Sequence, residues 1–136
     1  MHAWMIALQS ALVAAFAADA GLIALIGADA VFDAPPQGKT PPYVAIARHD
    51  AINRDALAAP GTDHRLTLNV WAGRASRRAA LEIAERLATV ALTAGLDGGG
   101  LKVTHRLCER TETEIDLDTG RARAAVRLRF FCEADA

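Results

Sequence analysis

The side chains best suited to acid–base chemistry or metal binding are four histidines. No two of them stand at the i, i+4 spacing of a helical metal pair, and none belongs to an H-E-x-x-H pattern. A single histidine in a strand or at the edge of a loop is most often a surface residue. We therefore predict surface or rim positions for the histidines, which are His2, His49, His64 and His105.

Cys108 and Cys132 are the two residues that could supply a thiolate nucleophile. Two widely spaced thiols do not make a disulfide framework or a metal cluster, so we expect a chain made in a reducing cytoplasm. His105 precedes Cys108 by three residues, but residues i and i+3 of a strand point to opposite faces and cannot meet locally. A long-range Cys–His pair stays open, and the default is two small, partly buried thiols.

Three other patterns resemble catalytic or binding motifs without completing them. Ser10 and Ser76 lack the G-x-S-x-G context of a nucleophile elbow. The glycines at 98–100 are not followed by G-K-[ST] and precede a predicted strand, which excludes a phosphate loop. Asp116 and Asp118 lack the glycine and glutamate that complete a calcium loop. We therefore expect no catalytic residue, no cofactor and no metal.

Arginines form two groups that favour contacts over catalysis. Arg74 and Arg77, with Arg78, lie at a predicted helix N-terminus, where the macrodipole does not favour cations. This group is either an interface or phosphate-contact patch or, the interpretation we favour, a solvated helix end. The second group lies on one face of the last strand and consists of Arg121, Arg123, Arg127 and Arg129.

The second arginine group has two interpretations. It could pair across a hairpin with the acidic arm that carries Glu109, Glu112 and Glu114, or it could line a DNA channel in a ring. Opposite charges across a strand pair contribute roughly 0.2–1 kcal/mol each. We favour pairing, because the acidic arm supplies nearly enough partners.

Length and composition bound the fold that must position these side chains. The chain has 136 residues and a formal net charge of −1, which fits one domain over 1–136 without a global excess of positive charge for nucleic acid. An apolar run covers residues 3–18, but no lysine or arginine precedes it and it is shorter than the roughly 20 residues of a membrane span. We interpret it as a helix rather than a signal or a membrane anchor.

Hydrophobic spacing predicts the elements of the first half. A helix over 2–17 carries an apolar stripe, and Asp19 caps a short second helix that ends at Gly27. Strands are predicted over 30–33, 43–49 and 65–71, with Leu66, Leu68 and Val70 facing one way. The proline-rich segment 34–42 is predicted as a loop, and residues 50–62 as a long projecting loop.

The second half predicts one helix and one long hairpin. Ser76 caps a helix over 77–94, on whose outer face Arg78, Glu82 and Arg86 are spaced for ion pairs. The hairpin has arms over 101–115 and 121–132 and a turn over 116–120. The fold class is therefore α+β: an antiparallel sheet with a long C-terminal hairpin, packed on one side by an N-terminal helix and a central helix.

With its elements in this order, the whole chain resembles the phage tail-completion family, small proteins of the tail-to-head joining and tail-terminator type. The resemblance rests on the N-terminal Ala-Leu helix, the closing hairpin and four segments between them. These are DAGLIALIGADAVFDAPP (19–36), PPYVAIA (41–47), RLTLNVWAG (65–73) and RAALEIAERLATVAL (78–92). The alanine and arginine richness is similar to the version carried by gene transfer agents.

The resemblance implies a structural protein and not an enzyme. Such proteins form a ring, usually of six subunits, that caps the tail tube, ends its polymerisation and docks the tail to the head connector or stopper. The implied partners are further copies of the chain, the tail tube protein and the connector, with DNA passage through the ring as an option and no membrane. The implied location is the tail of a phage-like particle made in the bacterial cytoplasm.

We therefore predict interface residues in place of a catalytic site. They lie in the segment 50–62, at the start of the central helix and on the last strand: Arg54, Asp55, Leu57, Pro60, Arg74, Arg77, Arg127 and Arg129. The proline loop is a further expected contact. Normal particles and tail length after deletion of residues 53–61 would exclude the contact by segment 50–62.

The alternative is a small cytoplasmic enzyme or ligand-binding domain that uses Cys108 or a histidine. That hypothesis predicts a pocket, a monomer or dimer, and loss of function in Cys108→Ala.

Overall fold

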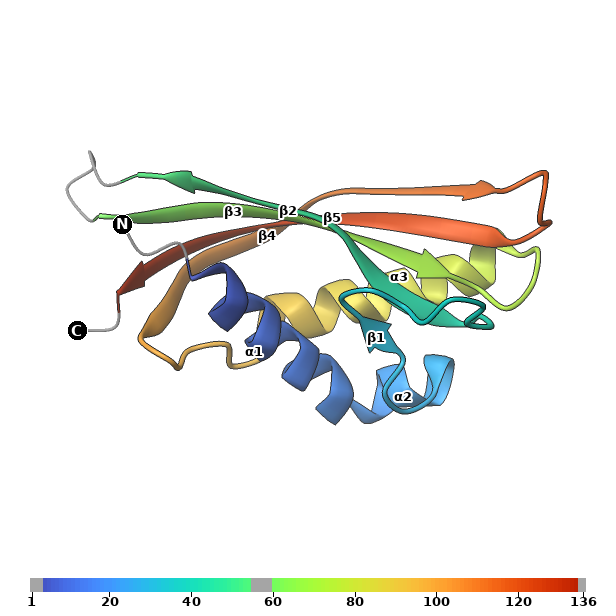
Figure 1. Ribbon diagram of the computed structural model, residues 1–136, viewed down its shortest axis with the longest axis horizontal. Coiled ribbons are helices and arrows are strands. Elements are labelled where there is room, and N and C mark those ends of the chain that lie inside the picture. The colour runs from blue at the N-terminus through green and yellow to red at the C-terminus, as the bar shows by residue number, and fades with distance from the viewer. Residues whose placement is uncertain (1–3, 55–59, 135–136) are drawn as a thin grey trace.

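A computed structural model describes residues 4–54 and 60–134. Three helices and five strands follow one another along the chain (Figure 1). Their order is α1 (Met5–Ala18), α2 (Ala20–Ile26), β1 (Val31–Phe32), β2 (Tyr43–Asn53), β3 (Gly61–Trp71), α3 (Arg77–Thr93), β4 (Leu101–Ile115) and β5 (Ala122–Ala134).

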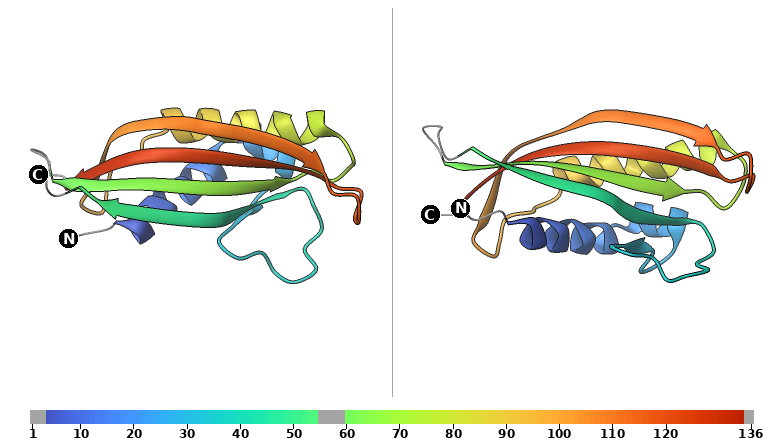
Figure 2. Two further views of the ribbon diagram at one scale, coloured as in Figure 1. Left: turned by 90° about the horizontal axis from the view of Figure 1, so that it is seen from above. Right: turned by 45° about the horizontal axis from the view of Figure 1, so that its top comes forward.

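The strands form one sheet in the order β1-β2-β3-β5-β4. Strands β2, β3, β5 and β4 pair antiparallel, whereas the two-residue β1 pairs parallel with β2, so the predicted antiparallel sheet is mixed at one edge. All three helices lie against one face, and Figures 1 and 2 show the other face bare. We call the bare side the outer face. The α+β class and the one-sided packing are confirmed.

The N-terminal helices form where the sequence predicts them. In α1 the spacing of four places Leu8, Leu12 and Phe16 against the core, each at most 2% exposed. The Asp19 carboxylate accepts a hydrogen bond from the backbone N–H of Leu22 and so caps α2, which ends at Gly27 with a φ of 87°. Only a glycine adopts that φ at low cost, which explains the stop.

Helix α3 packs mainly against strands β5 and β4. The hydroxyl of Ser76 accepts a hydrogen bond from the N–H of Ala79 and begins the helix as predicted. On its outer side Arg78 pairs with Glu82 at 3.1 Å. The predicted continuation to Arg86 is wrong, because that guanidinium instead holds Asp19 with nitrogen–oxygen distances of 2.6 and 2.8 Å and so joins α3 to the start of α2.

The C-terminal hairpin agrees with its predicted arms. The Asp116 carboxylate accepts hydrogen bonds from the N–H groups of Asp118 and Thr119 and orders the turn. Alternate residues of β5 then enter the core, and Val126, Leu128 and Phe130 are fully buried. Period-two alternation on a half-buried strand accounts for this burial.

The predicted projecting loop over 50–62 is wrong. Strand β2 continues to Asn53 and β3 begins at Gly61, so the two form a hairpin in which Asn53 opposes Thr62. Residues 55–59 of the predicted loop lie outside the described residues. Polar composition predicted a loop, but these strand ends are stabilised by cross-strand hydrogen bonds and by charged partners on β5, which local hydrophobicity does not reveal.

Candidate functional site

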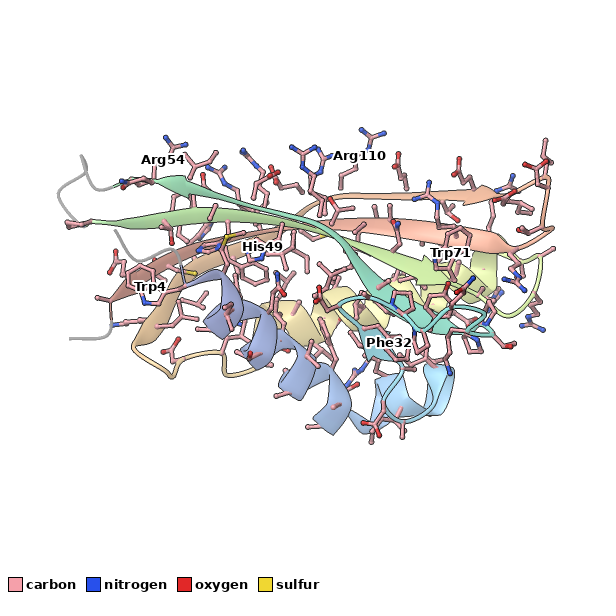
Figure 3. All side chains as sticks on the ribbon, in the orientation of Figure 1. Trp4, Phe32, His49, Arg54, Trp71 and Arg110 are labelled. Carbon is pink, nitrogen blue, oxygen red and sulfur yellow. The ribbon has the colours of Figure 1, made fainter. Side chains whose placement is uncertain are left out.

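A chain of hydrogen bonds between histidines joins α1 to the sheet. The side-chain nitrogen of Gln9 on α1 lies 2.8 Å from Nδ1 of His49 on β2, and Nε2 of His49 lies 2.8 Å from Nδ1 of His64 on β3. Nε2 of His64 lies 2.7 Å from the hydroxyl of Thr62. Figure 3 places His49 between the sheet and the helices.

Burial controls what this cluster can do. His64 is fully buried, and desolvation together with the charge of His64 lowers the pKa of His49 to about 4. The prediction of surface histidines is therefore wrong for His64. A neutral His49 in this chain of hydrogen bonds is suited to holding α1 against β2 and β3.

The sequence contained a signal for this cluster that the prediction missed. Leu66, Leu68 and Val70 face the core, and the same period-two alternation extended toward the start of β3 reaches His64 and Thr62. Both are at most 1% exposed. The predicted strand begins at Arg65 and is therefore too short, because polar residues at the start of β3 face the core.

The two cysteines lie in different surroundings. Cys132 is buried, and desolvation raises the pKa of its thiol to about 12, so it stays protonated at neutral pH. Cys108 opposes the buried Leu128, whereas His105 opposes Phe131 on the outer face, which confirms that the two side chains point apart. The Cys108 sulfur lies 3.6 Å from the Thr111 hydroxyl.

Two clefts beside α2 are lined by neither histidine nor cysteine. An apolar cleft of about 250 Å³ lies between α1, α2 and β1 and is lined by residues such as Phe16, Ile26 and Phe32. A second of about 330 Å³ lies between α2 and the start of α3 and includes Arg74. In the described part of the chain, no three histidine, cysteine, aspartate or glutamate side chains come close enough to hold a metal.

The outer face carries most of the ion pairs. Toward the β2–β3 hairpin end of this face, the Asp63 carboxylate has no exposed surface and receives two hydrogen bonds from Arg129, at 3.0 and 2.7 Å. Arg54 approaches the same carboxylate at 3.5 Å. The hydrogen bonds from Arg129 are the main cause that holds the pKa of Asp63 below its usual range.

The predicted charge pairing between the two arms of the C-terminal hairpin, β4 and β5, is largely wrong. Across the hairpin, Arg123 pairs with Glu114 at 2.6 Å. Glu109 instead pairs with Arg65 of β3 at 3.1 Å, and Glu112 pairs with Arg110 of its own strand at 2.8 Å. The register explains the difference, because from the turn onward it places Glu112 opposite Ala125 and Arg110 opposite Arg127, and Glu109 lies in the bulge between Cys108 and Arg110.

The predicted interface residues fall into separate places. Arg54, Pro60 and Arg129 lie toward the β2–β3 hairpin end of the sheet, and Arg127 is exposed on the outer face. Arg74 and Arg77 are exposed near the start of α3, at the other end of β3. Asp55 and Leu57 lie outside the described residues. Their role as interface residues stays a prediction.

Two surfaces stand out as candidates for contact with other molecules. The sheet has unpaired edges, since β4 has a neighbour on one side and β1 covers only Val44 and Ala45 of β2. Helices α1 and α2 contain no charged residue, and Ile6 on α1 is 83% exposed. No single helix among the described residues is long and apolar enough to cross a membrane; α1 and α2 reach that length only together and are bent by 81°.

Comparisons with known proteins agree on one family. The family model described as tail completion protein gp17 matches residues 10–133. A chain in the solved structure titled "Virion of native gene transfer agent (GTA) particle" superposes with a TM-score of 0.84 and 25% identity, over 98% of this chain and 100% of that chain. The search of curated proteins gave no match.

Proposed function

Because this chain belongs to the tail completion protein gp17 family, we propose that it is a single-domain subunit of a ring that caps a phage-like tail tube. The ring has six copies, ends polymerisation of the tube at its head-proximal end and joins the tail to the head connector. The likeness to a chain of a gene transfer agent virion supports a particle of that kind. The family consists of tail structural proteins, so no reaction is proposed.

The two unpaired sheet edges carry this proposal. Successive antiparallel pairings from β2 through β3 and β5 make β4 run opposite to β2. A rotation about an axis parallel to the strands keeps strand directions, so it brings β4 of one subunit beside β2 of the next as an antiparallel pair. Such a heterologous contact closes into a ring and leaves no edge free.

Features of β4 fit an edge that pairs only during assembly. Its two bulges and its charged side chains hinder unregulated pairing between isolated copies. The uncharged surface of α1 adds apolar area next to the free part of β2, because Gln9 of α1 reaches His49 of β2. A helix that is apolar all round is usually covered, and the neighbouring subunit is the cover that a ring supplies.

Light scattering of the purified chain, alone and mixed with tail tube protein, tests the proposal. We expect a ring mass alone or a stable complex that contains several copies once the tube is present. A chain that stays monomeric and does not bind tubes would exclude the capping role. Loss of a function in Cys108→Ala would instead favour the small-enzyme alternative, with wild-type Tm as the control for folding.

A further inference from the structure

The outer face presents an excess of guanidinium groups between the β2–β3 hairpin and the row in which Glu112, Ala125 and Asn69 lie side by side. This region spans all four long strands. Its carboxylates are Asp50, Asp63, Glu109 and Glu112, and at its rim Lys102 opposes Glu133. Six arginines stand among the four carboxylates, and we call them the arginine face: Arg48, Arg54, Arg65, Arg110, Arg127 and Arg129.

The exposed layer of the arginine face is more positive than this count indicates. The Asp63 carboxylate has no exposed surface, whereas the side chains of Arg54 and Arg129, which contact it, are 42% and 26% exposed. The guanidinium carbon of Arg129 also lies over the ring of Phe131, 4.8 Å from the ring centroid, a cation–π contact that helps to hold it in place. A molecule that approaches the sheet therefore meets nitrogen donors before it meets the carboxylate.

Arg110 and Arg127 place two like charges opposite each other on neighbouring strands. Such a pair is destabilising unless an anion balances it. Glu112 pairs with Arg110 at 2.8 Å, but Arg127 has no ion-pair partner in the described part of the chain. Figure 3 shows Arg54 and Arg110 pointing away from the helices, so both ends of the arginine face are open to a ligand.

We propose that the arginine face binds the phosphate backbone of duplex DNA. Guanidinium groups match phosphate oxygens with paired hydrogen bonds, and charges spread over an open sheet suit a long polyanion better than a small one. No helix projects from this face to enter a groove, so the contact reads the backbone and not the base sequence. The inference rests on the proposed ring in one respect: in that ring, the outer face lines the central channel.

The test measures fluorescence anisotropy of a labelled duplex of mixed sequence at several salt concentrations. Arg110→Gln/Arg127→Gln removes two cations from the arginine face. We expect roughly tenfold weaker binding near about 50 mM salt, and a slope of log affinity against log salt that falls by about two. The matched control is Lys39→Gln/Arg78→Gln, two exposed cations away from the outer face, which changes net charge equally and should leave both quantities unchanged.

Several outcomes would overturn the inference. They are no binding by the wild-type chain at low salt, equal losses in the two double variants, or an unchanged affinity in Arg110→Gln/Arg127→Gln. Loss of tube-protein binding in that variant with DNA affinity intact would assign the arginine face to a protein partner instead. Light scattering with tube protein separates the two proposals. The ring can form although the chain does not bind DNA, and the chain can bind DNA although no ring forms.

Discussion

The imidazole of His49 is neutral in the folded protein at neutral pH, because desolvation and the neighbouring His64 lower its pKa to about 4. His49 receives the side-chain amide of Gln9 on one nitrogen and contacts His64 through the other. Protonation would put a hydrogen on the Nδ1 that accepts from Gln9 and so break the contact with α1. The cluster therefore links the position of α1 to the protonation state of one side chain.

We predict that stability falls as the pH falls from about 6.5 to about 4.5. The pKa of His49 is lowered to about 4 in the folded chain, against an ordinary value of 6.5, so the unfolded state takes up the proton first. The contribution is complete above the unfolded pKa and is lost toward the folded one, on the order of 2–3 kcal/mol. Urea unfolding at pH 7.5, 6.5, 5.5 and 4.5 measures it.

His49→Gln is the control for this titration. Glutamine keeps a polar side chain that can bond Gln9 and His64 but does not titrate. The variant should lose some stability at pH 7.5 and then show a flatter profile down to pH 4.5. Parallel decline of the two proteins over that range would mean that other groups cause the pH dependence.

At the scale of elements, the close contact between β3 and β5 depends on Gly61. This residue begins β3 opposite Glu133, and a Cβ there would overlap the carbonyl oxygen of Cys132. The backbones are therefore closer than a side chain permits. This contact allows β3 to extend past Arg65 and to carry Asp63 beneath Arg129.

We predict that Gly61→Ala destabilises the chain by about 1–3 kcal/mol, because backbone must move to admit the methyl group. Gly95→Ala is the matched control, since a Cβ at Gly95 meets nothing within 4 Å. Chemical denaturation of both variants measures the difference. Equal stabilities would show that the strand ends separate at little cost.

At the scale of the whole molecule, ring closure requires that one free edge meets another. The N–H of Arg54 bonds to the carbonyl of Gly61, so it points toward β3. Because antiparallel residues alternate in direction, the N–H of Ala51 points to the free edge of β2. Removing the N–H of Ala51 should affect assembly while leaving the pairing of β2 with β3 in place.

We predict that Ala51→Pro folds but no longer assembles with itself or with tail tube protein. Proline is tolerated on an edge strand whose N–H faces outward, and it cannot donate to a neighbouring strand. Ala51→Ser keeps the N–H and should assemble as the wild type does. The two are compared by Tm and by light scattering, and assembly of the proline variant would contradict edge pairing.

Local sequence determined most of the elements of this protein and the reason for their ends. Asp19, Gly27 and Ser76 mark helix boundaries through hydrogen bonds and backbone angles that involve only neighbouring residues. The four-residue spacing of α1 and the alternation of β5 predict their buried faces. Each of these signals acts within a few residues, which is why the sequence alone is sufficient to read it.

Tertiary structure decided which polar residues meet. A bulge took Glu109 out of the strand ladder, the register placed Glu112 opposite Ala125, and pairing with β5 turned the ends of the predicted loop into strand. Burial of His64 and the partnership of Asp63 with Arg129 join residues far apart in the chain. Charge and hydrogen-bond partners depend on distance in space, so neither the histidine cluster nor the arginine face is fixed by local pattern.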